Sequence, residues 1–188
     1  VNLILPNKTG EQISKMLHDP RVRNLSFTGS TEVGRTLLKE SADCILRTSM
    51  ELGGNAPFVV LEDADIDEAV KGAMIAKMRN GGAACTAANR FIVAEKIAGE
   101  FTDKFSKAIS ELKVAPGLDE GAQLGASVSI KERNKIAELV ASSVNSGGEL
   151  KIGGKIPEGE GAFYPATVIE VKKDNPILKE EVFGPVAP

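Results

Sequence analysis

The chain contains no tryptophan, one histidine and two cysteines among its 188 residues, and aromatic residues make up only 4% of it. Two cysteines, Cys44 and Cys85, are too few for a disulfide framework and are typical of a reducing cytosol, so we expect a cytoplasmic location. One histidine and two distant cysteines also lack the ligand spacing of a zinc site. We therefore expect no metal centre.

Long apolar runs and concentrated positive charge are absent as well. No stretch approaches the roughly 18 uninterrupted apolar residues of a membrane span, and no basic, apolar and small-residue pattern marks a secretory signal. The formal net charge is −3, with both signs interspersed, whereas nucleic-acid binding requires a concentrated basic surface. We expect a globular enzyme that acts on a small molecule, with neither a membrane nor a nucleic acid as partner.

Hydrophobic periodicity predicts strands that alternate with amphipathic helices. This alternation is typical of an α/β protein with a mostly parallel sheet covered by helices on both faces. The chain starts without methionine and stops without a capping element, so we expect it to be cut at both ends. Strands are predicted within residues 1–6, 24–28, 47–61 (two strands around a glycine turn), 91–93, 151–154 and 166–169, and helices at 10–18, after 31, at 66–79, 97–112 and 130–146.

Cys85 is the first candidate for chemistry. It lies in a glycine-paired turn, residues 80–86 (NGGAACT), directly after a predicted helix. A thiol in such a turn ionises more readily than one packed in a core, and the thiolate is the nucleophilic form. The alternative is a small buried residue without chemistry, which is how we interpret Cys44.

A cysteine nucleophile needs a base, and Glu51 is the better candidate for that role. It opens a second glycine motif, residues 51–55 (ELGGN), 34 residues before Cys85. Partial burial at a strand end would make this carboxylate an effective general base. The alternative is a salt-bridged surface glutamate, and nothing in the pattern places His18 near the thiol.

Two further features favour ligand binding. Residues 27–34 (FTGSTEVG) predict a strand, a glycine turn and a helix start, a geometry that suits a phosphate; many such turns only connect a strand to a helix. Arg79, six residues before Cys85, could hold a substrate carboxylate in a two-pronged hydrogen bond. Its alternative role is to stabilise the C-terminus of a helix.

Taken in order, residues 27–34, 51–55, 80–85 and 180–186 (EEVFGPV) closely resemble the aldehyde dehydrogenase superfamily, and the resemblance covers the whole chain. Around Cys85 the chain looks most like succinate-semialdehyde dehydrogenases. The resemblance implies that residues 1–50 are the last part of a Rossmann-like NAD(P)-binding domain. Residues 51–188 would then be an incomplete catalytic domain of the parallel-sheet type.

The resemblance also implies roles for individual residues. Cys85 would attack the aldehyde, Glu51 would activate the water that hydrolyses the resulting thioester, and Arg79 would contact the carboxylate of succinate semialdehyde. NAD or NADP would be the cofactor, and the full-length protein would form dimers or tetramers. The implied cofactor contacts are the diphosphate at Gly29 and Ser30, the nicotinamide at Leu52, Gly53 and Phe183, and the nicotinamide ribose at Glu181.

Two positions depart from the family pattern. Ala83 stands where a glutamine is usual, and Ala87 stands where some relatives carry a second cysteine. Most of the cofactor domain is also missing, so we expect this segment alone to be inactive. Two other functions stay open: a cofactor-independent thiol acyltransferase or esterase, and a non-catalytic structural module. The dinucleotide motifs argue against the former, and the presence of Cys85 and Glu51 argues against the latter.

Overall fold

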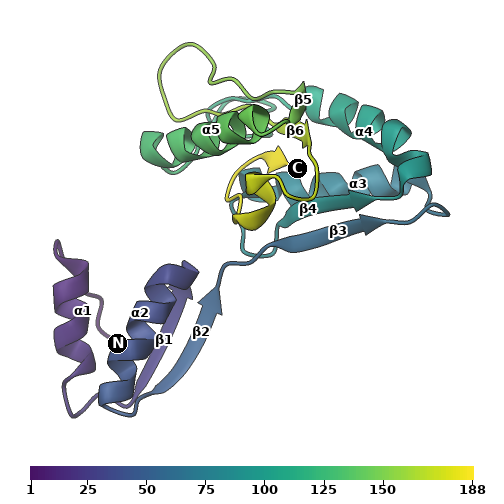
Figure 1. Cartoon of the computed structure of the whole chain (residues 1–188). Helices are drawn as coiled ribbons and strands as arrows, with labels where there is room; N and C mark the ends of the chain where they lie inside the picture. The colour runs from purple at the N-terminus through teal and green to yellow at the C-terminus, as the bar shows by residue number, and fades with distance from the viewer. The chain divides into compact units, whose positions relative to one another are not determined.

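Two units, Val1–Gly53 and Gly54–Pro188, make up the computed structural model, which describes all 188 residues. The division lies three residues beyond the boundary expected at residue 50. None of the helices combines the length and the apolar character needed to cross a membrane. The first unit contains α1 Thr9–Leu17, β1 Asn24–Gly29, α2 Thr31–Asp43 and β2 Arg47–Leu52 (Figure 1).

The first unit is a strand, helix and strand arrangement preceded by one helix. β1 and β2 pair in parallel, from Asn24 opposite Arg47 to Gly29 opposite Leu52. Helix α2 packs closely on β2. At Gly34 the helix is so near that a Cβ atom there would lie 2.6 Å from a methyl carbon of Leu52. Leu17 is nevertheless the only apolar side chain of this unit that is fully buried. The unit therefore has very little core of its own.

Two expectations for the first unit are wrong. Residues 1–6 form no strand, and Val1, Leu3 and Leu5 are exposed, because no neighbouring strand is there to pair with them. Cys44 is not a packing residue either. It caps the C-terminus of α2, its N–H donates to the carbonyl of Ala42, and its side chain is exposed.

The second unit has the alternation of strands and helices that the periodicity predicts, and its strands run mostly in parallel. β3 pairs with β4 and β6 with β7 in parallel, while β5 pairs with β6 in antiparallel fashion. The Phe91 N–H donates to the Pro188 carbonyl (2.8 Å), so β4 lies beside the end of β7. Its elements are β3 Ala56–Val60, α3 Ile66–Met78, η1 Arg79–Gly82, β4 Ala88–Val93, α4 Glu95–Ser110, α5 Ile130–Asn145, β5 Glu149–Ile152, β6 Thr167–Glu170, η2 Pro176–Lys179 and β7 Val186–Ala187.

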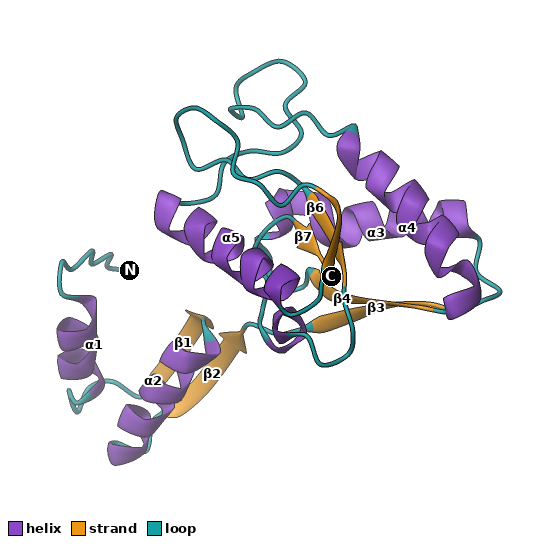
Figure 2. Ribbon diagram, turned by 45° about the horizontal axis from the view of Figure 1, so that its top comes forward, coloured by secondary structure: helices purple, strands orange, loops and turns teal.

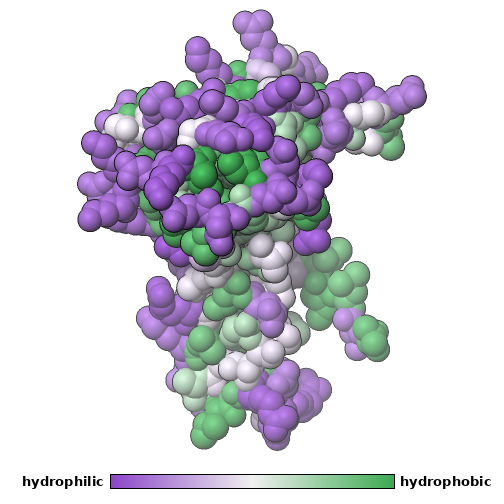
Figure 3. Space-filling model, turned by 90° about the vertical axis from the view of Figure 1, so that its right-hand side faces the viewer, coloured by the Kyte–Doolittle hydropathy of each residue, from purple (hydrophilic) through white to green (hydrophobic).

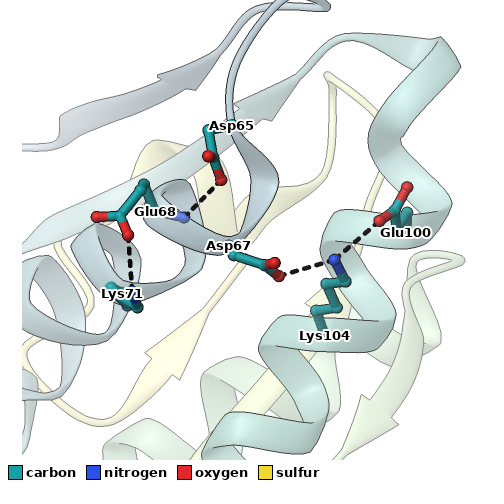
Figure 4. A network of polar contacts seen from close by, with 6 residues as sticks. All are labelled: Asp65, Asp67, Glu68, Lys71, Glu100 and Lys104. Carbon is teal, nitrogen blue, oxygen red and sulfur yellow. Dashed lines mark hydrogen bonds and ion pairs between the residues drawn. The ribbon is translucent and has the colours of Figure 1, made fainter.

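Helices α3 and α4 lie against each other on one side of β3 and β4 (Figure 2). Asp65 caps the N-terminus of α3, since its carboxylate accepts from the Glu68 N–H at 3.1 Å. Lys104 of α4 bridges Asp67 of α3 and Glu100 of its own helix at 2.7 and 2.9 Å (Figure 4). These pairs are exposed to solvent, so each contributes little to the stability of the fold. Buried aromatic side chains such as Phe101 and Phe105 hold the two helices together instead.

Only part of the sheet is covered on both faces. Alternate side chains of β6 and β7 lie in two separate hydrophobic clusters. In β6, Val168 packs with α3 and α4, whereas Ile169 packs with α5. The expectation of two covered faces is wrong for β3 and β4. Val59 and Ile92, on the face away from α3 and α4, are 55% and 52% exposed. Apolar surface among hydrophilic side chains is visible in the space-filling view (Figure 3).

Candidate active site

Residues 80–86, here called the cysteine turn, begin with three consecutive residues in the left-handed region. Asn80, Gly81 and Gly82 have φ values of 53°, 61° and 72°, and they reverse the chain directly after α3. The Asn80 side chain donates to the Ala83 carbonyl at 2.8 Å, which compensates for the strained backbone of a non-glycine residue. Cys85 follows in a second turn before β4, and its side chain is exposed.

Gly82 brings the cysteine turn against the segment that contains Glu181 and Phe183. A Cβ atom at Gly82 would lie 2.1 Å from the carbonyl oxygen of Gly184, so only glycine fits both the contact and the positive φ. Two motifs that are about 100 residues apart in the sequence therefore touch. A cavity of about 270 Å³ opens beside this contact, and its lining includes Asn80, Gly81, Ala83, Tyr164, Phe183 and Gly184.

A polar network that the sequence reasoning missed fixes the same segment from the other side. The Asn55 side chain donates to the carbonyls of Leu178 and Glu180, at 2.8 and 3.2 Å. The Asn55 carbonyl in turn accepts two N–H groups of Arg90, at 3.2 and 2.9 Å. The last residue of the ELGGN motif thus has a structural role: it holds residues 178–180 beside the start of β3.

Glu181 has an unpartnered carboxylate oxygen, and Phe183 has an exposed ring. One carboxylate oxygen of Glu181, Oε1, is buried and has no hydrogen-bond partner. A buried acceptor without a donor is costly, so a donor from a ligand would be stabilising there. Phe183 is 51% exposed and lines the cavity beside the cysteine turn.

Arg79 begins the cysteine turn, at the C-terminus of α3. Its side chain is exposed, and it belongs to none of the ten ion pairs of the chain. A guanidinium group without a carboxylate partner has its planar set of donors free for a ligand. Both predicted roles of Arg79, at the helix end and toward a substrate, fit this position.

The other predicted site residues lie in the first unit, at the carboxyl ends of β1 and β2. Gly29 is paired with Leu52, and Glu51 precedes Leu52 on the same strand. Ser30 caps α2, since its hydroxyl accepts from the Val33 N–H at 3.3 Å. The carboxyl end of parallel strands followed by a helix N-terminus is a common place for phosphate groups.

Glu51 and Cys85 lie in different units, so their pairing stays a prediction. The Glu51 side chain is exposed. The partial burial that would make it an effective base is therefore not provided by its own unit.

Comparison with known proteins gives a consistent result. The chain is 48% identical, over its whole length, to the succinate-semialdehyde dehydrogenase of Paenarthrobacter nicotinovorans, of which it covers 42%. It is 42% identical to the glutarate-semialdehyde dehydrogenase of Pseudomonas putida, with 98% of this chain and 38% of that protein covered. Among solved structures, the succinate-semialdehyde dehydrogenase of Burkholderia pseudomallei matches with a TM-score of 0.94 at 41% identity, over 98% of this chain and 38% of that one.

The chain thus spans about two fifths of the length of the curated relatives it matches. The fold of the matched region is that of aldehyde dehydrogenases, which confirms the α/β assignment made from the sequence. The model of the aldehyde dehydrogenase family matches residues 1–188. The chain belongs to the aldehyde dehydrogenase family.

Proposed function

We propose that this chain is the segment of an NAD(P)-dependent dehydrogenase that oxidises a carboxylated aldehyde, with succinate semialdehyde converted to succinate. The observation that carries the proposal is the contact between Gly82 and Gly184. It sets the turn of the nucleophilic Cys85 beside Glu181 and Phe183, the residues we assign to the cofactor. The names of the relatives, which act on succinate or glutarate semialdehyde, support the substrate class.

The reaction begins with attack of the Cys85 thiolate on the aldehyde carbon. A carbon–sulfur bond forms, the carbonyl π bond breaks, and the backbone N–H of Cys85 donates to the resulting oxyanion. Loss of a hydride from that carbon then gives a thioester. Glu51 removes a proton from a water molecule that attacks the thioester, and the carbon–sulfur bond breaks to release the carboxylic acid and the Cys85 thiolate.

A nicotinamide cofactor, when bound, supplies the acceptor for the hydride. The buried and unpartnered Oε1 of Glu181 fits a ribose hydroxyl donor, and the exposed ring of Phe183 offers an apolar face for the nicotinamide. In the first unit, Gly29 and Ser30 would hold the diphosphate at the start of α2, with Leu52 and Gly53 toward the nicotinamide. The proposal includes both NAD and NADP, a cytoplasmic location and a dimeric or tetrameric full-length protein.

A cofactor-independent acyltransferase or esterase is less well supported. Such an enzyme would need Cys85 and a base, but it gives no reason for an unpartnered carboxylate oxygen at Glu181. It also gives no reason for the phosphate-binding geometry at Ser30. A non-catalytic module of the same fold would have no use for an exposed cysteine that directly follows a strained turn.

Replacing Arg79 with leucine in the full-length protein tests the substrate class. A charged hydrogen-bonded pair contributes roughly 1.5–3 kcal/mol, so we expect the KM for succinate semialdehyde to rise by about 10-fold or more. The KM for an uncharged aldehyde of similar length should change less than about 2-fold. Steady-state kinetics with both aldehydes measures this, and Lys107→Leu, which removes an exposed cation from α4, is the matched control. Equal effects on the two aldehydes would refute the assignment.

The 188-residue segment alone should have no measurable dehydrogenase activity, although it carries both Cys85 and Glu51. Its first unit buries a single apolar side chain, Leu17, and contains only a two-stranded sheet, and such a sheet is not stable by itself in water. Absorbance of reduced cofactor at 340 nm, followed with succinate semialdehyde and either NAD or NADP, is the measurement. Sustained turnover by the segment would show that this expectation is wrong.

A further inference from the structure

Lys77 is a fully buried lysine for which neither the fold nor the proposed reaction has given a role. It lies on α3, one residue before the end of the helix, and its side chain is 0% exposed. Burial lowers the pKa of Lys77 to about 7. Removing an ammonium group from water is expensive and is tolerated only where specific partners compensate for it.

The Lys77 amine joins three segments of the second unit. Its Nζ atom donates to Oδ1 of Asn89 in β4 and to the carbonyl oxygen of Val182, both at 3.0 Å. Asn89 is also buried, and its side chain donates to the Gly54 carbonyl at 3.2 Å. One amine therefore connects the helix before the cysteine turn, the strand after it, and the segment that carries Glu181.

The partners of Lys77 leave the Glu181 carboxylate free. Lys77 and Glu181 form no ion pair within 4 Å, and Oε1 of Glu181 is buried without a partner. The two groups are nevertheless close enough for the negative charge of Glu181 to raise the pKa of Lys77, against the effect of burial. Lys77 is therefore near enough to Glu181 to act as its counter-charge, but it does not occupy the acceptor Oε1 of Glu181.

We propose that Lys77 is a positioning residue for Glu181: it fixes the neighbouring backbone through the Val182 carbonyl and places a positive charge near the Glu181 carboxylate, so that this carboxylate is held available for the ribose hydroxyls of a nicotinamide cofactor. This inference rests on the role of Glu181 in the proposed function. A purely structural role would need only the two hydrogen bonds, and it would affect folding rather than cofactor affinity.

A double-mutant cycle in the full-length protein separates these possibilities. The variants are Lys77→Met, which keeps most of the buried volume and removes the charge, Glu181→Gln, and the combination of both. The dissociation constants of NADH and NADPH are measured by fluorescence titration in the absence of aldehyde. The thermal midpoint of each variant is measured alongside, and Met78→Leu, a buried neighbour on α3, is the control for packing alone.

We expect Lys77→Met to weaken binding of the reduced cofactor by about 10-fold when Glu181 is present, and by less than about 2-fold in the Glu181→Gln background. Met78→Leu should leave the affinity unchanged whatever it does to the thermal midpoint. Equal losses in both backgrounds, or a lower midpoint with unchanged affinity, would overturn the inference. Failure of the unmodified protein to bind either reduced cofactor would instead refute the proposed function.

If Lys77→Met does not fold, Asn89→Asp provides a second route. An aspartate at position 89 keeps an acceptor for the Lys77 amine and adds a negative charge beside it, but it loses the hydrogen bond that Asn89 donates to the Gly54 carbonyl, so the thermal midpoint of this variant is measured as well. The affinity for reduced cofactor should then fall only while Glu181 is present. An unchanged affinity in Asn89→Asp would count against the role of Lys77.

Discussion

Replacing Cys85 with serine in the full-length protein should reduce the turnover number for aldehyde oxidation by a factor on the order of 10⁴ to 10⁶, the range found when an essential nucleophile is removed. A serine hydroxyl is a far weaker nucleophile than a thiolate at neutral pH, because it reacts only when a neighbouring base removes its proton. Steady-state kinetics measures the loss. Fluorescence titration should show that binding of the reduced cofactor is unchanged.

Cys44 supplies the control for this experiment within the same chain. It is the only other cysteine, it is exposed like Cys85, and it lies at the end of α2 rather than in a glycine turn. Cys44→Ser should keep full activity. Iodoacetamide should inactivate the unmodified protein and the Cys44→Ser variant at similar rates. Retained activity in Cys85→Ser, or inactivation that depends on Cys44, would refute the assignment of the nucleophile.

Replacing Glu51 with glutamine should separate the two halves of the reaction. If Glu51 activates the hydrolytic water, steady-state turnover falls by about 10²- to 10⁴-fold, the usual contribution of a general base. The thioester still forms, so a rapid burst of reduced cofactor equal to the concentration of active sites should precede the slow phase. Stopped-flow absorbance at 340 nm records both phases.

The size of that burst decides how far the role of Glu51 extends. Loss of both the burst and the turnover would mean that Glu51 also deprotonates Cys85. Unchanged turnover would exclude Glu51 as a base altogether. Glu11→Gln, which neutralises an exposed carboxylate on α1, is the matched control and should behave like the unmodified protein.

Hydrophobic periodicity predicted most helices and strands correctly, because each helix has a strong apolar stripe or a capping residue. Asp65 marks the start of α3, and Gly81 and Gly82 mark its end, so both boundaries could be predicted to within a residue or two. Residues 1–6 are apolar enough for a strand, but a strand exists only when a neighbour pairs with it. Whether other elements cover Val59 and Ile92 also depends on distant parts of the chain, so the hydrophobic pattern of these two strands could not predict it.

The candidate site was only partly visible in the sequence. Glycine turns and an unusual cysteine pointed to residues 80–86, and family motifs pointed to Glu181 and Phe183. Asn55, Asn89 and Lys77 were missed because their roles depend on contacts with segments more than 100 residues away or across the sheet. The sequence held one indication that Lys77 is buried. Its spacing from Val70 and Ala73 places it on the apolar face of the same helix.

The van der Waals contact of Gly82 with Gly184 has a consequence for protein engineering. Two backbones that meet without any intervening side chain cannot shift independently, so a change of shape in either loop is transmitted to the other. Libraries that vary residues 80–84 to obtain new aldehyde preferences should therefore also alter the affinity for the coenzyme. Screens of such libraries need to score both properties together.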